Sequence, residues 1–267
     1  MAGPSRRSLI ARGLPAREAR WLIEEFRDAA DLERAVTRRL AGEPLQYVIG
    51  HWPFRSLDLE VNENVLIPRP ETEELVDVAL VVLAESGAVA PRILDLGCGS
   101  GAIGLSLLYE LEERGVVATL VAVDASTAAL EVAKRNARSS GLSRVSFVHS
   151  SWFSSLDPSL RATFDLIVSN PPYVAAEEMA GLDPVLAYEP RSALVAPDAA
   201  GTPGFGDLAV IIAAAGEWMS DDAALVCEHG ANQAAAAIAA ARAAGFSRVE
   251  DRTDLAGHDR ILVARRS

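Results

Sequence analysis

Residues 92–104 constrain the fold more than any other part of this sequence. The apolar run at 92–96 predicts a buried strand, the glycine-rich segment 97–101 predicts a tight loop, and apolar positions at 105, 107, 108 and 111 predict a helix. Because glycine has no side chain, such a loop lets the backbone approach a bound ligand closely. The segment therefore predicts the first strand–loop–helix unit of a ligand-binding α/β sheet.

Strands and helices continue to alternate after this unit. Further strands are expected at 119–124, 145–148, 164–169 and 223–228, and two last ones at 248–250 and 261–264. Helices are expected from 126 to about 140 and near 231–244, each followed by a glycine that favours a helix end, Gly141 and Gly245. This alternation predicts a mostly parallel sheet with helices on both faces and a ligand at the carboxyl ends of the strands.

Two acidic residues indicate the class of ligand. The glycine spacing alone fits NAD as well as S-adenosylmethionine. Asp95, two residues before Gly97, would repel a pyrophosphate but attract the ammonium and sulfonium charges of S-adenosylmethionine. Asp124 ends the second strand, where a carboxylate can accept hydrogen bonds from both ribose hydroxyls. A helix N-cap is the alternative role for Asp124, but Ser126 is available for it.

The turn Asn170-Pro171-Pro172-Tyr173 follows the apolar run 164–168 and suits one chemical problem, making a planar nitrogen nucleophilic. An amide nitrogen shares its lone pair with its carbonyl, so hydrogen-bond acceptors around its N–H groups must hold and polarise it. The Asn170 side-chain oxygen and the Pro171 carbonyl can be those acceptors, the prolines stiffen the turn, and Tyr173 can lie flat against the planar group. An ordinary strand-ending turn is the alternative.

With both elements, the chain resembles the peptide chain release factor glutamine methyltransferases, the family also called HemK or PrmC. The resemblance is most specific in the Ile-Pro-Arg-Pro-Glu-Thr run at 67–72 and the Glu-Pro-Arg-Ser-Ala-Leu run at 189–194. It also covers residues 42–47 with Gly50, the glycine loop, Asp124, residues 150–153, the Asn-Pro-Pro-Tyr turn and residues 254–260.

The resemblance implies a fold, a reaction and a set of site residues. The fold is that of a class I S-adenosylmethionine-dependent methyltransferase, with a Rossmann-like seven-stranded sheet. The reaction transfers a methyl group to the side-chain nitrogen N5 of the glutamine in the Gly-Gly-Gln motif of a release factor. The cofactor-binding residues are Asp95, Gly97, Cys98, Gly99, Ser100, Gly101, Asp124, Trp152 and Asn170, and the catalytic and substrate-binding residues are Asn170, Pro171, Pro172 and Tyr173.

Two assignments keep an alternative. Trp152 matches a position that contacts the adenosine in this family, and an indole suits stacking on a base, but core packing would also use it. Many relatives have an acid just before this position, whereas this chain has Ser151, which weakens the expected contact with the adenine amino group. Glu189 and Arg191 could order the loop after the Asn-Pro-Pro-Tyr turn or form an exposed salt bridge.

Three regions are expected along the chain. Residues 1–42 form a short helical domain, residues 43–70 a β-hairpin linker with near-alternating apolar residues from 45 to 68, and residues 71–267 the methyltransferase domain. A helix opens at Glu71, where early acids suit its N-terminus. The resemblance implies that the helical domain docks the protein substrate, and that this one is shorter than is usual in the family.

Charge and composition limit the partners. The net charge is −12, although residues 1–40 hold nine arginines against six acids, and so acidic a body argues against a duplex nucleic acid held by its phosphates. The two cysteines and four histidines lack metal-ligand spacing, and no apolar stretch is long enough to span a membrane. We therefore expect no metal and no membrane, and a cytoplasmic monomer.

Other functions remain open from the sequence. An adenine-N6 nucleic-acid methyltransferase uses the same Asn-Pro-Pro-Tyr turn, because an exocyclic amine flipped into a pocket poses the same problem. A ribosomal-protein glutamine is a second possible substrate, although the Ile-Pro-Arg-Pro-Glu-Thr run favours release factors. A non-enzymatic module that binds translation factors is disfavoured because the cofactor loop and the catalytic turn are both intact.

Overall fold

A computed structural model describes residues 5–266 and is built around a seven-stranded sheet. The strand order is β5-β4-β3-β6-β7-β9-β8, and every pairing is parallel except those of β9 with β7 and β8. This confirms the predicted mostly parallel, seven-stranded sheet. The strands are β3 (Arg92–Leu96), β4 (Thr119–Asp124), β5 (Val145–His149), β6 (Phe164–Ser169), β7 (Met219–Glu228), β8 (Arg248–Thr253) and β9 (Asp259–Arg265).

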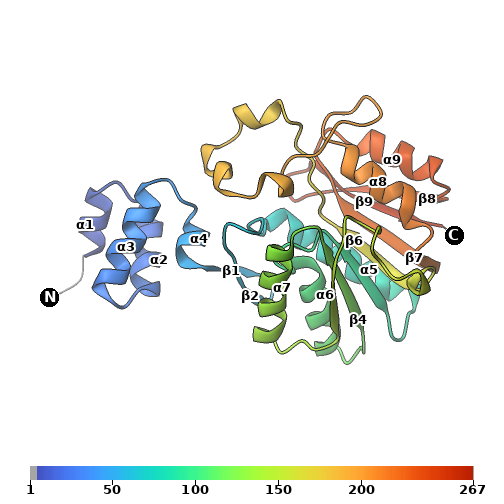
Figure 1. The fold of residues 1–267 in the computed structure, drawn as a ribbon, viewed down its shortest axis with the longest axis horizontal. Helices are drawn as coiled ribbons and strands as arrows, with labels where there is room; N and C mark the ends of the chain where they lie inside the picture. The colour runs from blue at the N-terminus through green and yellow to red at the C-terminus, as the bar shows by residue number, and fades with distance from the viewer. Residues whose placement is uncertain (1–4, 267) are drawn as a thin grey trace.

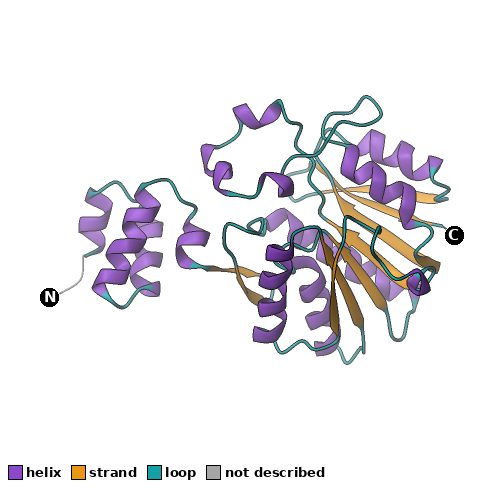
Figure 2. Cartoon of the chain, in the orientation of Figure 1, coloured by secondary structure: helices purple, strands orange, loops and turns teal. Residues whose placement is uncertain are grey.

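Helices cover both faces of this sheet (Figure 2). Residues alternate between the faces along each central strand, so that Ile93 packs into one apolar cluster and Leu94 into the other. Three helices contribute to the Ile93 face: α5 (Pro70–Ser86), α6 (Ala102–Glu113) and α7 (Thr127–Ser139). Two cover the Leu94 face: α8 (Gly206–Ala215) and α9 (Ala234–Ala243). Because both faces are buried, the central strands β3, β4 and β6 are mostly apolar.

The N-terminal helices form a separate small body (Figure 1). They are α1 (Arg6–Ala11), α2 (Ala16–Glu25), α3 (Ala29–Leu40) and α4 (Leu45–Ile49). Their own apolar cluster is distinct from the two clusters of the sheet. The expected short amphipathic helices are therefore present, and residues 1–4 and Ser267, at the outer ends of the expected domains, lie outside the described residues.

The linker differs from the expected long hairpin. Residues 45–49 are helical, and Leu45 and Val48, three residues apart, both pack into the N-terminal cluster, as one face of a helix allows. The apolar residues Leu45, Tyr47 and Ile49 also alternate along the sequence, which is the pattern of a strand. Gly50, with φ of 92°, ends this helix. The hairpin itself is only β1 (His51–Phe54) with β2 (Leu57–Glu60). Figure 1 shows it between the helical body and the sheet.

A long connection follows β6 and lies over one end of the sheet (Figure 1). Between β6 and α8 it contains three short 3₁₀ helices: η2 (Glu178–Gly181), η3 (Pro184–Tyr188) and η4 (Arg191–Ala193). A further 3₁₀ helix, η1 (Pro158–Leu160), precedes β6. Tyr188 Oη donates to the carbonyl oxygen of Ala41 at 3.0 Å, so this connection also contacts the N-terminal helices. The sequence predicted neither these turns nor α8.

Candidate active site

A cavity of about 410 Å³ opens at the carboxyl ends of β3, β4 and β6. This is the edge at which parallel α/β sheets bind their ligands, and the volume suits a small molecule. Its walls come from the linker, the glycine loop, the ends of β4, β5 and β6, and the connection before α8. They include Leu66, Pro68, Thr72, Gly97, Cys98, Gly99, Ser100, Asp124, Ser150, Ser151, Trp152, Asn170, Pro172, Pro190, Ser192, Ala193 and Asp207.

The glycine loop forms one wall of the cavity. Gly101 adopts φ of 85° at the start of α6, and a Cβ there would lie 2.6 Å from Leu105. A Cβ on Gly97, at φ of 69°, would lie 3.3 Å from the Trp152 ring, which lines the same cavity. Only glycine therefore lets the loop turn this tightly while leaving room beside the indole.

Asp124 stands at the end of β4 and holds the loop in place. Its Oδ2 accepts from the Gly99 N–H at 2.9 Å, and its Oδ1 accepts from the Ser126 N–H at 2.8 Å. Burial raises the pKa of Asp124, and these backbone hydrogen bonds lower it in part. Ser126 caps α7 by accepting from the Ala129 N–H. Each carboxylate oxygen of Asp124 keeps a lone pair for a ligand in the cavity.

Asp95 lies behind the loop and does not line the cavity. It is on the same face of β3 as Ile93, so its side chain points to the first turn of α6, where Oδ2 accepts from the Gly104 N–H at 3.0 Å. The side chain is 1% exposed, and its Oδ1 has no hydrogen-bond partner among the described residues. Burial raises the pKa of Asp95 to about 7. The geometry therefore gives Asp95 a role in fixing the loop, whereas the sequence had suggested direct contact with the ligand.

Trp152 lines the cavity beside the loop. It has φ of 49°, an uncommon backbone region for a residue with a side chain, and its Nε1 donates to Asp207 Oδ1 at 3.3 Å. Asp207, in the first turn of α8, also lines the cavity, and no sequence pattern had marked it. The hydrogen bond fixes the indole, whose six-membered ring lies beside Gly97.

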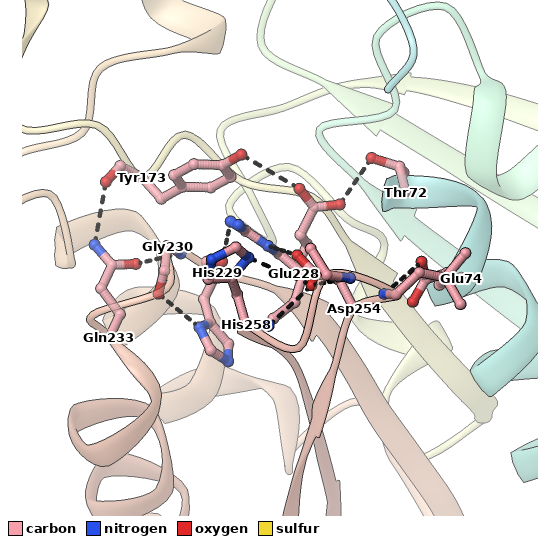
Figure 3. A network of polar contacts seen from close by, with 12 residues as sticks. Thr72, Glu74, Tyr173, Glu228, His229, Gly230, Gln233, Asp254 and His258 are labelled. Carbon is pink, nitrogen blue, oxygen red and sulfur yellow. Dashed lines mark hydrogen bonds and ion pairs between the residues drawn. The ribbon is translucent and has the colours of Figure 1, made fainter. Parts of the chain in front are cut away.

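The Asn-Pro-Pro-Tyr turn closes the far side. Asn170 and Pro172 line the cavity, whereas Pro171 and Tyr173 do not. Asn170 Nδ2 donates to Thr72 Oγ1 at 3.1 Å. Tyr173 Oη instead donates to Glu228 Oε1 at 3.3 Å (Figure 3), and Tyr173 does not line the cavity. The sequence indicated Thr72 only as the last residue of the run at 67–72, and Glu228 only as the last residue of the strand at 223–228.

Glu189 joins the long segment between β6 and α8 to the linker. Its buried carboxylate accepts from the Ile67 N–H at 3.0 Å and from the guanidinium of Arg69. This orders the segment whose residues Pro190, Ser192 and Ala193 line the cavity, and it is not an exposed salt bridge. Arg191 is exposed.

Two other properties of the described residues bear on the site. No group of three or more His, Cys, Asp or Glu side chains among residues 5–266 is arranged to hold a metal ion. No helix in that range is long and apolar enough to cross a membrane.

The seven-stranded sheet, the glycine loop with its acid at the end of β4, and the cavity between them define a class I S-adenosylmethionine-dependent methyltransferase. Residues 73–183 match the family described as "Methyltransferase small domain". The fold is similar to that of a methyltransferase from Pyrococcus furiosus, with a TM-score of 0.53 and 14% identity over 88% of this chain and 99% of that one. It is also similar to a 16S rRNA methyltransferase from T. thermophilus in complex with AdoMet and guanosine, with a TM-score of 0.55 and 16% identity over 81% of this chain and 50% of that one.

Relatives with higher sequence identity identify the family more specifically. The chain is 40% identical to the release factor glutamine methyltransferase of Burkholderia pseudomallei, over 85% of this chain and 78% of the relative. It is 41% identical to that of Bordetella pertussis, over 92% and 83%, and 39% identical to that of Coxiella burnetii, over 88% and 79%. The chain belongs to the release factor glutamine methyltransferase family.

Proposed function

We propose that this protein transfers a methyl group from S-adenosylmethionine to the side-chain nitrogen N5 of the glutamine in the Gly-Gly-Gln motif of peptide chain release factors. The observation that carries the proposal is the orientation of Asn170 at the cavity wall. Its Nδ2 is engaged by Thr72, which leaves the side-chain oxygen to accept from a substrate N–H. Family membership identifies the substrate, since the relatives are named for it.

The cofactor fits the residues that surround the cavity. Asp124 retains two lone pairs for the ribose hydroxyls, the loop around Gly97 and Gly99 offers backbone without side chains, and Trp152 presents a flat surface to the adenine. Cys98 and Ser100 complete this wall, whereas Gly101 and Asp95 support it from behind. When bound, S-adenosylmethionine supplies a methyl group on a positively charged sulfur, which is an activated leaving group.

The chain's own residues then have to orient and polarise the substrate nitrogen. Asn170 Oδ1 and the Pro171 carbonyl would accept from the two N–H groups of the glutamine amide, which fixes the nitrogen and enriches its lone pair. Pro172 stiffens the turn and forms part of the wall. Tyr173 supports the turn through Glu228. The methylated nitrogen then loses its extra proton to water or through the acceptor oxygens, so the transfer needs no general base among the cavity residues.

We further propose that the N-terminal helices, the expected domain 1–42, help to dock the release factor. The hydrogen bond from Tyr188 to Ala41 links these helices to the connection that borders the cavity. Leu182 and Tyr188, both in this connection, are exposed apolar side chains that a protein partner can cover. The net charge of −12 supports activity without stable binding to nucleic acid. A cytoplasmic location and a monomeric state stay predictions.

A transfer assay tests the proposal. The purified protein is incubated with methyl-labelled S-adenosylmethionine and one of four acceptors: a release factor, the same factor with Glu in place of the Gly-Gly-Gln glutamine, a ribosomal-protein mixture, or adenine-containing DNA and RNA. We expect label in the unchanged release factor only, because a carboxylate has no N–H to donate to Asn170. Label in nucleic acid together with an unlabelled release factor would establish the adenine-N6 alternative.

A further inference from the structure

A buried chain of hydrogen bonds ends at Asn170. Thr72 Oγ1 lies 3.1 Å from Asn170 Nδ2 and 2.7 Å from Glu228 Oε2. The second oxygen of Glu228 accepts from Tyr173 Oη at 3.3 Å. Figure 3 shows the Glu228 carboxylate between the hydroxyls of Thr72 and Tyr173. These residues come from the first turn of α5, the end of β6, the turn after β6 and the end of β7, so tertiary structure alone brings them together.

The protons available in this hydrogen-bond network decide whether the oxygen or the NH₂ group of the Asn170 amide faces the cavity. An ionised carboxylate only accepts hydrogen bonds, so the single hydroxyl proton of Thr72 must go to Glu228. The Thr72 oxygen can then only accept from Asn170, and the donor of that amide is its NH₂ group. The carbonyl oxygen of Asn170 is consequently turned to the cavity. A flipped amide would place NH₂ there, which cannot accept from a substrate N–H.

The far end of the chain is held firmly. Glu228 is 1% exposed and Thr72 is 4% exposed, so water does not compete for their hydrogen bonds. Burial raises the pKa of Glu228, while the Thr72 hydrogen bond and the charge of Arg260 lower it. Burial also raises the pKa of Tyr173, so its hydroxyl remains a donor. The two donors and the nearby cation oppose this effect of burial, and the hydroxyls of Thr72 and Tyr173 each have one carboxylate oxygen of Glu228 to donate to.

We propose that Thr72 and Glu228 are positioning residues for methyl transfer: through the Glu228–Thr72–Asn170 chain they fix the Asn170 carbonyl oxygen toward the substrate nitrogen. The proposal rests on the proposed function, because it concerns the orientation of the group that would receive the substrate amide. It differs from a purely structural role, since it affects turnover through one amide and leaves the cofactor wall formed by Asp124 and Trp152 untouched.

The test compares Thr72→Val with Thr72→Ser in the full-length protein. Valine keeps the shape but removes the hydroxyl, whereas serine keeps the hydroxyl. We expect Thr72→Val to lower kcat by about tenfold, the equivalent of one lost hydrogen bond, while Kd for S-adenosylmethionine changes by less than about threefold. Thr72→Ser should restore kcat to within about threefold of the wild type. Ser106→Ala is the matched control, because it removes a buried hydroxyl in α6 that makes no hydrogen bond, and it should leave kcat unchanged.

Glu228 gives a second test that does not depend on the folding of Thr72→Val. Glu228→Gln keeps an acceptor for Thr72, so it should retain kcat within about threefold, whereas Glu228→Met should lower kcat about as much as Thr72→Val. Wild-type turnover by Thr72→Val, failure of serine to restore it, or equal losses in Glu228→Gln and Glu228→Met would each overturn the inference. An inactive wild-type protein would instead refute the proposed function, so the two failures are distinguishable.

Discussion

Replacing Asp124 by alanine should weaken S-adenosylmethionine binding by an amount that follows from its hydrogen bonds. Two of about four lone-pair sites on the carboxylate are already used by the N–H groups of Gly99 and Ser126. Two remain, one for each ribose hydroxyl. Charge-assisted hydrogen bonds contribute roughly 1.5–3 kcal/mol each before desolvation is subtracted, and this half-buried carboxylate is costly to desolvate. We therefore expect a net loss of about 2–4 kcal/mol, or a Kd raised roughly 30- to 700-fold.

Isothermal titration calorimetry of S-adenosylmethionine into wild type and Asp124→Ala measures this loss directly. The variant also leaves two backbone N–H groups unpaired, but in the free and the bound protein alike, so that effect appears in thermal unfolding more than in Kd. Asp157→Ala is a suitable control, because it removes an exposed carboxylate that accepts from the Ser159 N–H outside the cavity. A Kd for Asp124→Ala within about threefold of the wild type would refute the assignment of Asp124 to the ribose.

Three further predictions concern the catalytic turn, the buried acid and the helical domain. Asn170→Ala should lower kcat by about two orders of magnitude or more; single-turnover methylation at wild-type rate would contradict this. Because burial raises the pKa of Asp95 to about 7, the folded protein holds a proton that the unfolded chain releases near pH 4, so stability should fall as pH rises from about 4 to about 7 and level off above. Asp95→Asn, whose amide oxygen can still accept from Gly104, should lose less stability over that range in urea titrations, and a parallel pH dependence would exclude this cause. Deleting residues 1–43 while keeping Tyr47, whose hydroxyl donates to the Val65 carbonyl, should preserve cofactor binding and raise KM for the release factor; loss of cofactor binding would argue against separate roles for the two parts.

The sequence predicted the parts of the fold that depend on local pattern. Apolar runs and glycine stops predicted the seven strands, and their alternation with helices predicted a mostly parallel sheet, because a buried strand and an amphipathic helix have different periods. The helix at 45–49 was not predicted, because five residues are too few to separate the two periods. Over these five residues Leu45, Tyr47 and Ile49 fit a strand, whereas Leu45 and Val48 fit a helix, and only the packing of the N-terminal cluster decides between them.

The site was predictable where a residue's role depends on its place at a strand end, and less so where it depends on tertiary contacts. Asp124 is the last residue of β4 and Asn170 directly follows β6, so both lie at the carboxyl ends of strands on the two sides of β3. Both line the cavity as expected. The direction of the Tyr173 ring depends on Glu228, 55 residues later in the chain, and the orientation of Asn170 on Thr72, 98 residues earlier. No local pattern reports such long-range partners, so the chain of hydrogen bonds behind the turn required the structure.

Locating the transferred methyl group tests the central claim most directly. A release factor is incubated with the wild-type protein and S-adenosylmethionine in the presence of equal amounts of DNA and RNA, and the products are then analysed by tandem mass spectrometry of peptides and of nucleosides. We predict one added methyl group on the side-chain amide of the Gly-Gly-Gln glutamine and no methylated adenine. With Asn170→Ala in place of the wild type, the rate of glutamine methylation should fall by about two orders of magnitude or more. Methylated adenine beside an unmodified Gly-Gly-Gln peptide would contradict it.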